Sequence, residues 1–294
     1  MSKVKMLLRE LGRTLIAFAF LVTVASVMAW IQLMNDNVSL KRQITMQPSL
    51  ADFANRLHGA WWVRPWMADV SLYFMVGGGV AGLVFGYALR GRLLYAVQTL
   101  RRFLWLMGLG YALRGLTLAG TILPPSNPSC NYVHRTAWEA MQAVPQLLSG
   151  STHTCSDKIF SGHTLVATLL AAFWFHYSGN WRLCKVYAGL NWLLMVTCSL
   201  AGRHHYTVDI VVGAIVAALI FNIYGLLLRL VTAEQASCGQ CIGNGHVQVN
   251  RILRAIIVFM DGLDIRDPGM GKTTGVYLPI YLDTATSKKL ETCV

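Results

Sequence analysis

Long apolar runs alternate with short polar stretches along most of this chain. An apolar helix of about 20 residues crosses a lipid bilayer, and most of the runs approach that length. We expect six membrane-spanning helices, at residues 14–34, 70–89, 103–122, 165–177, 186–201 and 210–230. The first run is too long for the core of a signal peptide and is expected to remain as a helix. The pattern predicts an all-α, polytopic membrane protein.

The composition supports a membrane protein and argues against nucleic-acid binding. Of the 294 residues, 55% are hydrophobic and only 13% are charged, which is typical of polytopic membrane proteins. The net charge of +12 could serve nucleic-acid binding, but the basic residues cluster beside the apolar runs. In that position they set membrane orientation and meet anionic lipids. We therefore expect no nucleic-acid partner.

The basic residues also predict which helix ends face the cytosol. They are concentrated in the amino terminus, in the linker 90–102, in the polar break 178–185 and in the tail. Since cytosolic segments are rich in Lys and Arg, we expect these parts to be cytosolic. The loops before helices two, four and six then face the lumen or the exterior. The predicted organisation is a cytosolic terminus at 1–13, a six-helix membrane domain at 14–230 and a cytosolic tail at 231–294.

Two histidine-bearing segments stand at the ends of a predicted helix pair. The first is C-S-D-K-I-F-S-G-H-T at 155–164, and the second is H-Y-T-V-D at 205–209. Because the two helices between them lead out and back, His163 and His205 are expected at one membrane surface. Asp209 lies four residues after His205 and shares a helix face with it. Two imidazoles backed by an acid suit phosphoryl transfer, in which one attacks phosphorus and the other protonates the leaving oxygen.

Neighbouring polar residues favour chemistry over simple packing. A single histidine in a membrane protein is more often a packing or capping residue than a catalytic one. Here Ser161 offers a hydroxyl beside His163, and Arg203 can hold phosphate oxygens. Arg114 lies within the third predicted helix, where a charge is costly. It is expected either to pair with an acid or to hold a lipid phosphate.

The histidine segments resemble the active-site motifs of the sphingomyelin synthase and sphingolipid (inositol phosphorylceramide) synthase family, a branch of the type 2 phosphatidic acid phosphatase superfamily. Residues 101–124 resemble that family's motif around its third helix, and Glu139 its following acidic position. Ser156 departs from the usual glycine, and Q-P-S-L-A-D at 47–52 only partly matches a proline-rich motif. The resemblance covers roughly residues 40–230 and implies a helical bundle of the superfamily's type.

The resemblance also implies a reaction. Phosphocholine, phosphoethanolamine or phosphoinositol would pass from a glycerophospholipid to ceramide with release of diacylglycerol, and no metal or other cofactor is expected. His205 would form a phosphohistidine with Asp209 behind it, while His163 would act first as acid and then as base. Six further positions are expected to support the site or bind substrate: Glu139, Asp157, Ser161, Arg114, Arg203 and Tyr206.

The resemblance also suggests roles for two acids and a location for the protein. Glu139 and Asp157 would either hold His163 in the right tautomer or seat a cationic headgroup. The protein is expected in the Golgi or plasma membrane, with its site facing the lumen or exterior and both termini in the cytosol. The headgroup and the oligomeric state, including a homo-oligomer, are left open.

Two other functions are weighed against the transferase. A lipid phosphatase would use the same histidines with water as the acceptor, but its K-x6-R-P motif is not matched here. A non-catalytic scaffold or channel would need no pair of histidines with an acid at one face.

The cysteines and the tail leave further alternatives open. Cys130 and Cys155 fall in one predicted lumenal loop, where they either form a disulfide or remain free thiols. Residues 251–265 are expected to form a short interfacial helix. Cys238 and Cys241 are either palmitoylated or unmodified cytosolic thiols.

Overall fold

The computed structural model describes residues 3–42, 44, 50–52, 66–88, 93–126, 130–178, 181–236 and 250–261. Within these ranges the chain forms eight α-helices and no strand. The helices are α1 (Lys3–Lys41), α2 (Trp66–Ala88), α3 (Leu93–Gly120), α4 (Ala137–Leu148), α5 (Gly162–Tyr177), α6 (Arg182–Ala201), α7 (Thr207–Ala236) and α8 (Arg251–Asp261). The all-α prediction is confirmed for the described part of the chain.

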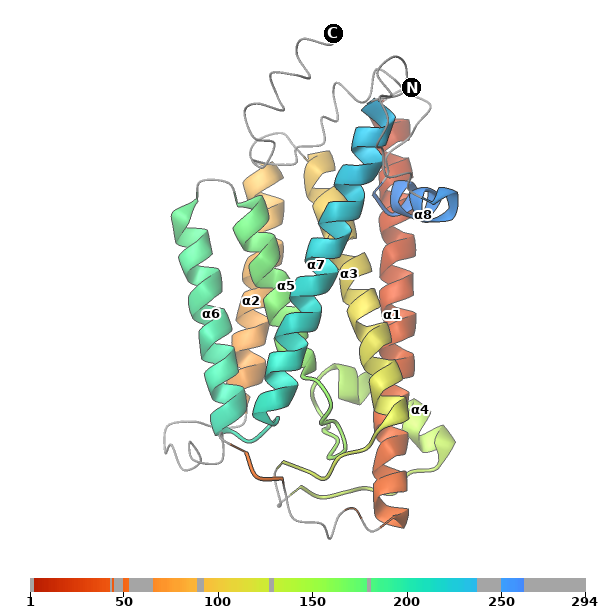
Figure 1. The fold of residues 1–294 in the computed structure, drawn as a ribbon, viewed down its shortest axis with the longest axis vertical. Coiled ribbons are helices and arrows are strands. Elements are labelled where there is room, and N and C mark those ends of the chain that lie inside the picture. The colour runs from red at the N-terminus through yellow and green to blue at the C-terminus, as the bar shows by residue number, and fades with distance from the viewer. Residues whose placement is uncertain are drawn as a thin grey trace.

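Six long helices form an elongated bundle, and two short helices lie at its opposite ends (Figure 1). α1 packs mainly along α3, α5 packs against α6 and α7, and α2 packs against α6. α8 lies across the bundle near the amino terminus, whereas α4 lies beside α1 at the other end. The starts of α5 and α7 share the α4 end, and α5 runs through the core, where Leu165 and Leu169 are fully buried.

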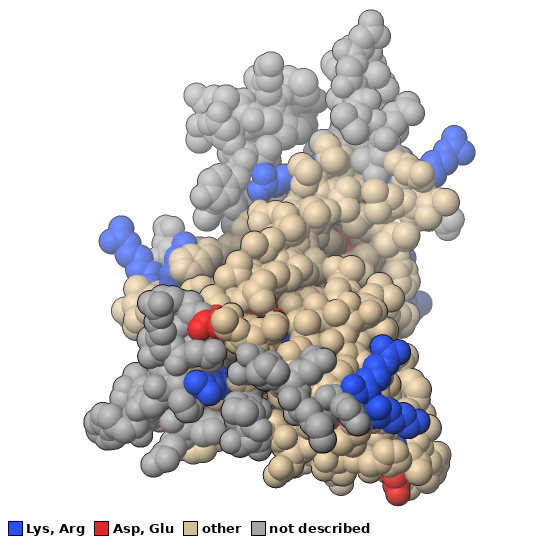
Figure 2. Space-filling view, turned by 60° about the horizontal axis from the view of Figure 1, so that its bottom comes forward, with Lys and Arg blue, Asp and Glu red and all other residues tan. Residues whose placement is uncertain are grey.

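Among the described residues, four helical segments are long and apolar enough to span a membrane: Leu7–Lys41, Tyr95–Gly120, Arg182–Ala201 and Thr207–Val231. Large apolar side chains are exposed along them, among them Leu15, Leu183 and Leu219, and few blue or red side chains interrupt the tan surface in Figure 2. These features fit an integral membrane protein. The crossings expected at 70–89 and 165–177 are not among these four and remain predictions. The second range falls in α5, which has only 16 residues.

α1 is longer than the first predicted helix because polar residues near its end face the protein. Residues 35–41 were expected in a loop, but they continue the helix to Lys41. Asn35 Nδ2 donates to the carbonyl of Leu118 at 2.8 Å, and Asn37 Oδ1 accepts from the amide of Arg135 at 2.9 Å. These side chains satisfy backbone groups of other segments, so their polarity did not indicate a loop.

The expected linker 90–102 is also partly helical, since α3 begins at Leu93. Arg101 and Arg102 are buried in α3. Arg102 Nη2 lies 2.8 Å from Asp261 Oδ2, and Arg101 Nε donates to the carbonyl of Met260 at 2.9 Å. The two arginines therefore fasten the end of α8 to the bundle.

The short helices are a partial confirmation and a correction. α8 confirms the helix predicted within 251–265, of which 262–265 lie outside the described residues. Cys238 and Cys241 lie outside them too. α4 falls inside 124–160, which was expected to be a loop throughout.

Candidate active site

The structure brings His163 and His205 together. His163 is the second residue of α5, and His205 lies in the turn between α6 and α7. Their ring centroids are 6.2 Å apart, and the ring planes meet at 60°. The helix pair α5 and α6 therefore does what the sequence pattern predicted, and returns the chain to the level it left.

Hydrogen bonds join the two histidine segments directly. Ser161 caps α5, because its Oγ accepts from the amide of Thr164 at 3.2 Å. The Ser161 amide donates to the carbonyl of Asp209 at 3.0 Å. A Cβ at Gly162 would lie 2.7 Å from Arg114 Nη1, so glycine lets this arginine pack against the start of α5 without a shift of its guanidinium group. Ser161 thus supports the site through capping and a backbone contact.

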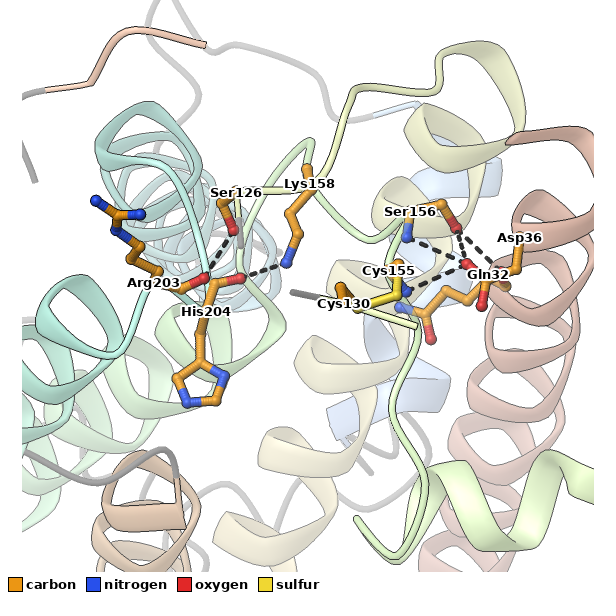
Figure 3. Close-up of a disulfide and its surroundings, with 9 residues drawn as sticks. All are labelled: Gln32, Asp36, Ser126, Cys130, Cys155, Ser156, Lys158, Arg203 and His204. Atoms are coloured by element: carbon orange, nitrogen blue, oxygen red, sulfur yellow. Dashed lines mark hydrogen bonds between the residues drawn. A yellow bond between two sulfur atoms is a disulfide. The ribbon is translucent and has the colours of Figure 1, made fainter. Parts of the chain in front are cut away.

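The turn that carries His205 is held by side chains from other segments. Arg203 has a positive φ of 53°, an uncommon conformation for a residue with a side chain. Ser126 Oγ donates to the carbonyl of Arg203 at 2.8 Å, and Lys158 Nζ donates to the carbonyl of His204 at 2.5 Å (Figure 3). Two consecutive carbonyls are therefore fixed just before His205. The guanidinium of Arg203 points away from the His204 ring in the same view.

His205 and Asp209 form a buried pair in line with the i, i+4 spacing. His205 Nδ1 lies 3.6 Å from Asp209 Oδ2, beyond hydrogen-bond distance, while that oxygen accepts from the Tyr206 amide at 3.0 Å. Asp209 Oδ1 and His205 Nδ1 are buried without a hydrogen-bond partner. Burial lowers the pKa of His205 well below its usual range, and the positive charge of Lys158 lowers it further. The ring is therefore neutral at neutral pH, as a nucleophile must be.

Asp69, in the first turn of α2, is the acid that contacts His163. The distance between His163 Nε2 and Asp69 Oδ1 is 2.7 Å, and about a quarter to a third of each side chain is exposed, 30% and 26%. Asp69 was not among the predicted site residues. The available signal was its position as an acid at the predicted lumenal end of an apolar run.

The two acids expected to hold His163 do not contact it. Glu139 accepts from the amide of Thr136 at 2.7 Å and completes a capping box at the start of α4. Asp157 instead forms a partly buried ion pair with Arg114. Of the two alternatives given for these acids, contact with His163 is made by Asp69 instead, and a role in seating a cationic headgroup stays a prediction.

Arg114 was expected either to pair with an acid or to hold a lipid phosphate. It is buried, pairs with Asp157 and donates from Nε to the carbonyl of Phe160 at 2.9 Å. Of the two expected roles, the structure shows pairing with an acid. The arginine thereby anchors the loop that leads into α5.

Tyr206 and Asp52 hold the start of α7. The Tyr206 hydroxyl lies 3.2 Å from the carbonyls of Pro124 and Pro125 and accepts from the amide of Leu50 at 3.1 Å. Asp52 accepts from the amide and from the hydroxyl of Thr207, at 2.6 Å each. Asp52 was not among the predicted site residues, although it is the last residue of the partly matched segment 47–52.

A disulfide ties the loop after α3 to the first histidine segment. It joins Cys130 to Cys155, whose Cα atoms are 5.8 Å apart (Figure 3). Next to it, Asp36 Oδ1 accepts from Ser156 Oγ at 2.8 Å and from the amides of Cys155 and Ser156 at 3.2 Å each. Ser156, where the related family usually has glycine, thus makes a side-chain contact of its own. Within the described ranges no group of three or more His, Cys, Asp or Glu side chains is placed to hold a metal ion.

A family model matches the part of the chain that holds the site. Residues 154–226 match the family model described as PAP2 superfamily C-terminal, the type 2 phosphatidic acid phosphatase superfamily. The match contains His163, His205 and Asp209, and it agrees with the resemblance noted from the motifs.

Similar curated proteins narrow this class. The chain is 31% identical over 150 residues to human (Homo sapiens) phosphatidylcholine:ceramide cholinephosphotransferase 1, covering 47% of this chain and 36% of that protein. It is 29% identical over 245 residues to the Rattus norvegicus protein of that name, covering 78% and 55%. Human sphingomyelin synthase-related protein 1 is 29% identical over 147 residues, covering 47% and 35%. The chain thus spans between about a third and about half of the length of these relatives.

Proposed function

We propose that this protein transfers a phospho-headgroup from a glycerophospholipid to ceramide and releases diacylglycerol. The observation that carries the proposal is the pair of facing imidazoles, each backed by its own carboxylate. In-line phosphoryl transfer needs the attacking atom and the leaving oxygen on opposite sides of phosphorus. Two rings with centroids 6.2 Å apart suit groups that act on one phosphorus from two sides.

In the first half-reaction, His205 attacks. Its Nδ1 faces Asp209, which leaves Nε2 to form the N–P bond as the bond between phosphorus and the diacylglycerol oxygen breaks. His163, whose Nε2 is held by Asp69, gives the proton on its other nitrogen to that oxygen. Diacylglycerol leaves, and the headgroup phosphate stays on His205. Asp209 balances the positive charge that develops on the phosphorylated ring.

The second half-reaction reverses the roles. His163 takes the proton of the ceramide primary hydroxyl, the ceramide oxygen attacks phosphorus, and the N–P bond to His205 breaks. Proton transfer of this kind contributes about 10²- to 10⁴-fold to a rate. Both histidines return to their starting state, and the product is a ceramide phospholipid.

The names of the relatives support the substrate class. Phosphatidylcholine:ceramide cholinephosphotransferase 1 acts, by its name, on phosphatidylcholine and ceramide. For this chain we propose ceramide as the acceptor and phosphatidylcholine, phosphatidylethanolamine or phosphatidylinositol as the donor. We further propose six crossings, a site facing the lumen or exterior, cytosolic termini, and residence in the Golgi or plasma membrane.

The test is a transfer assay with the full chain in liposomes. The liposomes contain fluorescent ceramide and equal amounts of the three donors, and mass spectrometry identifies the products. We expect one ceramide phospholipid and an equal amount of diacylglycerol. Water-soluble phosphorylated headgroup with unchanged ceramide would instead indicate hydrolysis of the donor, and inorganic phosphate released from phosphatidic acid added to the same liposomes would indicate a lipid phosphatase. No product of any of these kinds would contradict an enzymatic role.

Variants assign the chemistry within the same assay. His205→Ala should abolish transfer and hydrolysis, because no phosphohistidine can form. His204→Ala is the matched control, since this neighbouring ring is not part of either histidine–acid pair, and its loss should be mild. An inactive His204→Ala beside an active His205→Ala would overturn the assignment of the nucleophile.

A further inference from the structure

Lys158 is a buried ammonium group next to the proposed nucleophile. It lies in the loop before α5, and only 7% of its surface is exposed. Its Nζ donates to the carbonyl of His204, the residue that precedes His205, at 2.5 Å (Figure 3). The side chain therefore reaches from the first histidine segment to the second.

This ammonium group is not neutralised by a close carboxylate in the described part of the chain. No Asp or Glu oxygen there lies within 4.0 Å of Nζ. Asp157 and Asp209 act on the ammonium group only from a longer distance, and Asp157 pairs with Arg114. A buried charge without a close counter-charge is costly, and burial lowers the pKa of Lys158. Such a cost is typical of functional sites, and it is offset when an anion binds nearby.

We propose that Lys158 is a positioning residue for the transfer proposed above: it fixes the peptide that presents His205, and its charge offsets the negative charge of the phosphoryl group on that ring. The inference rests on the proposed function, because that reaction brings an anionic phosphodiester to His205. In a buried site of low dielectric, a fixed positive charge acts strongly on charge that develops in the transition state. Arg114 cannot substitute for it, since its charge is taken up by Asp157.

The same charge affects the protonation of His205. Charged and titratable groups from several described elements act on this ring: Lys158 from the loop before α5, His163 from α5, Arg114 from α3, His204 from the same turn and Asp209 from α7. Burial is the main cause of the lowered pKa of His205, and Lys158 is the largest electrostatic one. Removal of the lysine charge should therefore raise the pKa of His205. The acid limb of the activity profile would then move to higher pH.

Two substitutions separate charge from hydrogen bonding. Lys158→Met removes the charge and the donor at nearly constant size, whereas Lys158→Gln removes the charge and keeps a donor for the His204 carbonyl. Lys185→Met is the matched control, because this lysine lies near the start of α6, at the other end of the bundle. The full chain is assayed in liposomes for kcat, KM of the donor, the pH profile and the thermal midpoint.

We expect both Lys158 variants to lose about 10- to 100-fold in kcat, with a smaller change in KM and an acid limb at higher pH. Lys185→Met should match the wild type. If Lys158→Gln keeps the wild-type kcat and pH profile, the lysine only holds a carbonyl and the inference fails while the proposed function stands. A wild-type protein that forms no ceramide phospholipid contradicts the proposed function and the inference with it. Should Lys158→Met not fold, as judged from its thermal midpoint, Lys158→Gln decides alone.

Discussion

At the scale of single residues, the two histidine–acid pairs differ in a way that fits two tasks. His163 and Asp69 are partly exposed and hydrogen-bonded at 2.7 Å. His205 and Asp209 are buried and 3.6 Å apart. A proton carrier needs a route to substrate and solvent, whereas a nucleophile needs a dry site in which it stays neutral. The geometry thus favours His163 for protons and His205 for phosphorus.

Asp69→Asn tests the proton-carrying pair. The amide keeps the shape and a hydrogen bond but no longer stabilises the imidazolium, so kcat should fall by about 10²-fold or more. A donor lipid with a better leaving group should restore much of the first half-reaction, because departure then needs less help from His163. The release of the leaving group is measured in a single turnover. An unchanged kcat would show that Asp69 does not support the reaction.

The burial of His205 also makes a prediction about stability. A histidine in the unfolded chain titrates near 6.5, whereas the pKa of folded His205 lies well below that value. Below about pH 6.5 the unfolded state therefore binds the extra proton first, and folded stability is lost at up to about 1.4 kcal/mol per pH unit. Above that pH His205 is neutral in both the folded and the unfolded state, and it causes no loss of folded stability.

The measurement is the thermal midpoint of the purified protein between about pH 7 and pH 5. The wild type should lose stability over this interval, and His205→Asn should lose less. Equal losses in the two proteins would mean that other groups control the acid sensitivity.

Residue patterns predicted part of this site and missed the rest for a physical reason. His163, His205 and Asp209 could be predicted to meet, because two apolar helices and one i, i+4 spacing determine their placement. Asp69 could not, since it is 94 positions away from His163 in sequence and its contact depends on how α2 packs beside α5. The capping contact of Glu139 with Thr136 could not be predicted either, because a glutamate that follows a threonine by three residues fits both a capping box and an acidic site position.

At the scale of the elements, loops rather than helices position the reacting groups. The segments on either side of α4 carry Cys130, Cys155, Asp157 and Lys158. The disulfide joins the two segments, Asp157 ties the second to Arg114 of α3, and Lys158 ties it to the turn before α7. Apolar runs predicted where helices lie. Their ends could not be predicted, because Asn35 and Arg102 are polar residues that are buried by partners from distant segments.

Removal of the disulfide should therefore affect stability first and activity second. A cross-link that closes a loop of 25 residues contributes on the order of 3 kcal/mol. Cys130→Ser should lower the thermal midpoint and also reduce kcat, since the first histidine segment begins at Cys155.

Thiol labelling provides the check. In the folded wild type, Cys130 and Cys155 should resist alkylation until a reductant is added, whereas the free thiol of Cys184, which is partly exposed, should react at once. Alkylation of either Cys130 or Cys155 without reductant would contradict the disulfide.

At the scale of the whole molecule, basic residues indicate an orientation in the membrane. The end of the bundle with α8 carries Lys5, Arg9 and Arg13 of α1, the basic residues at the start of α6, and Arg251 of α8. At the site end, Arg114 and Lys158 are buried. Lys and Arg beside apolar helices favour the cytosolic side, so the α8 end is expected in the cytosol.

The resulting topology can be tested with glycosylation tags. An acceptor sequence inserted after Leu148, just beyond α4 at the site end, should be glycosylated in cells if that end faces the lumen, as we propose. A tag added at Val294 should stay unmodified, since the tail follows α7 back to the cytosolic end. Endoglycosidase treatment and a mobility shift on gels measure both, and transfer activity confirms that each tagged chain is folded. Modification of the tail tag alone would show that the bundle has the opposite orientation. His163 and His205 would then lie on the cytosolic side, and donor lipid and ceramide would have to come from the cytosolic leaflet.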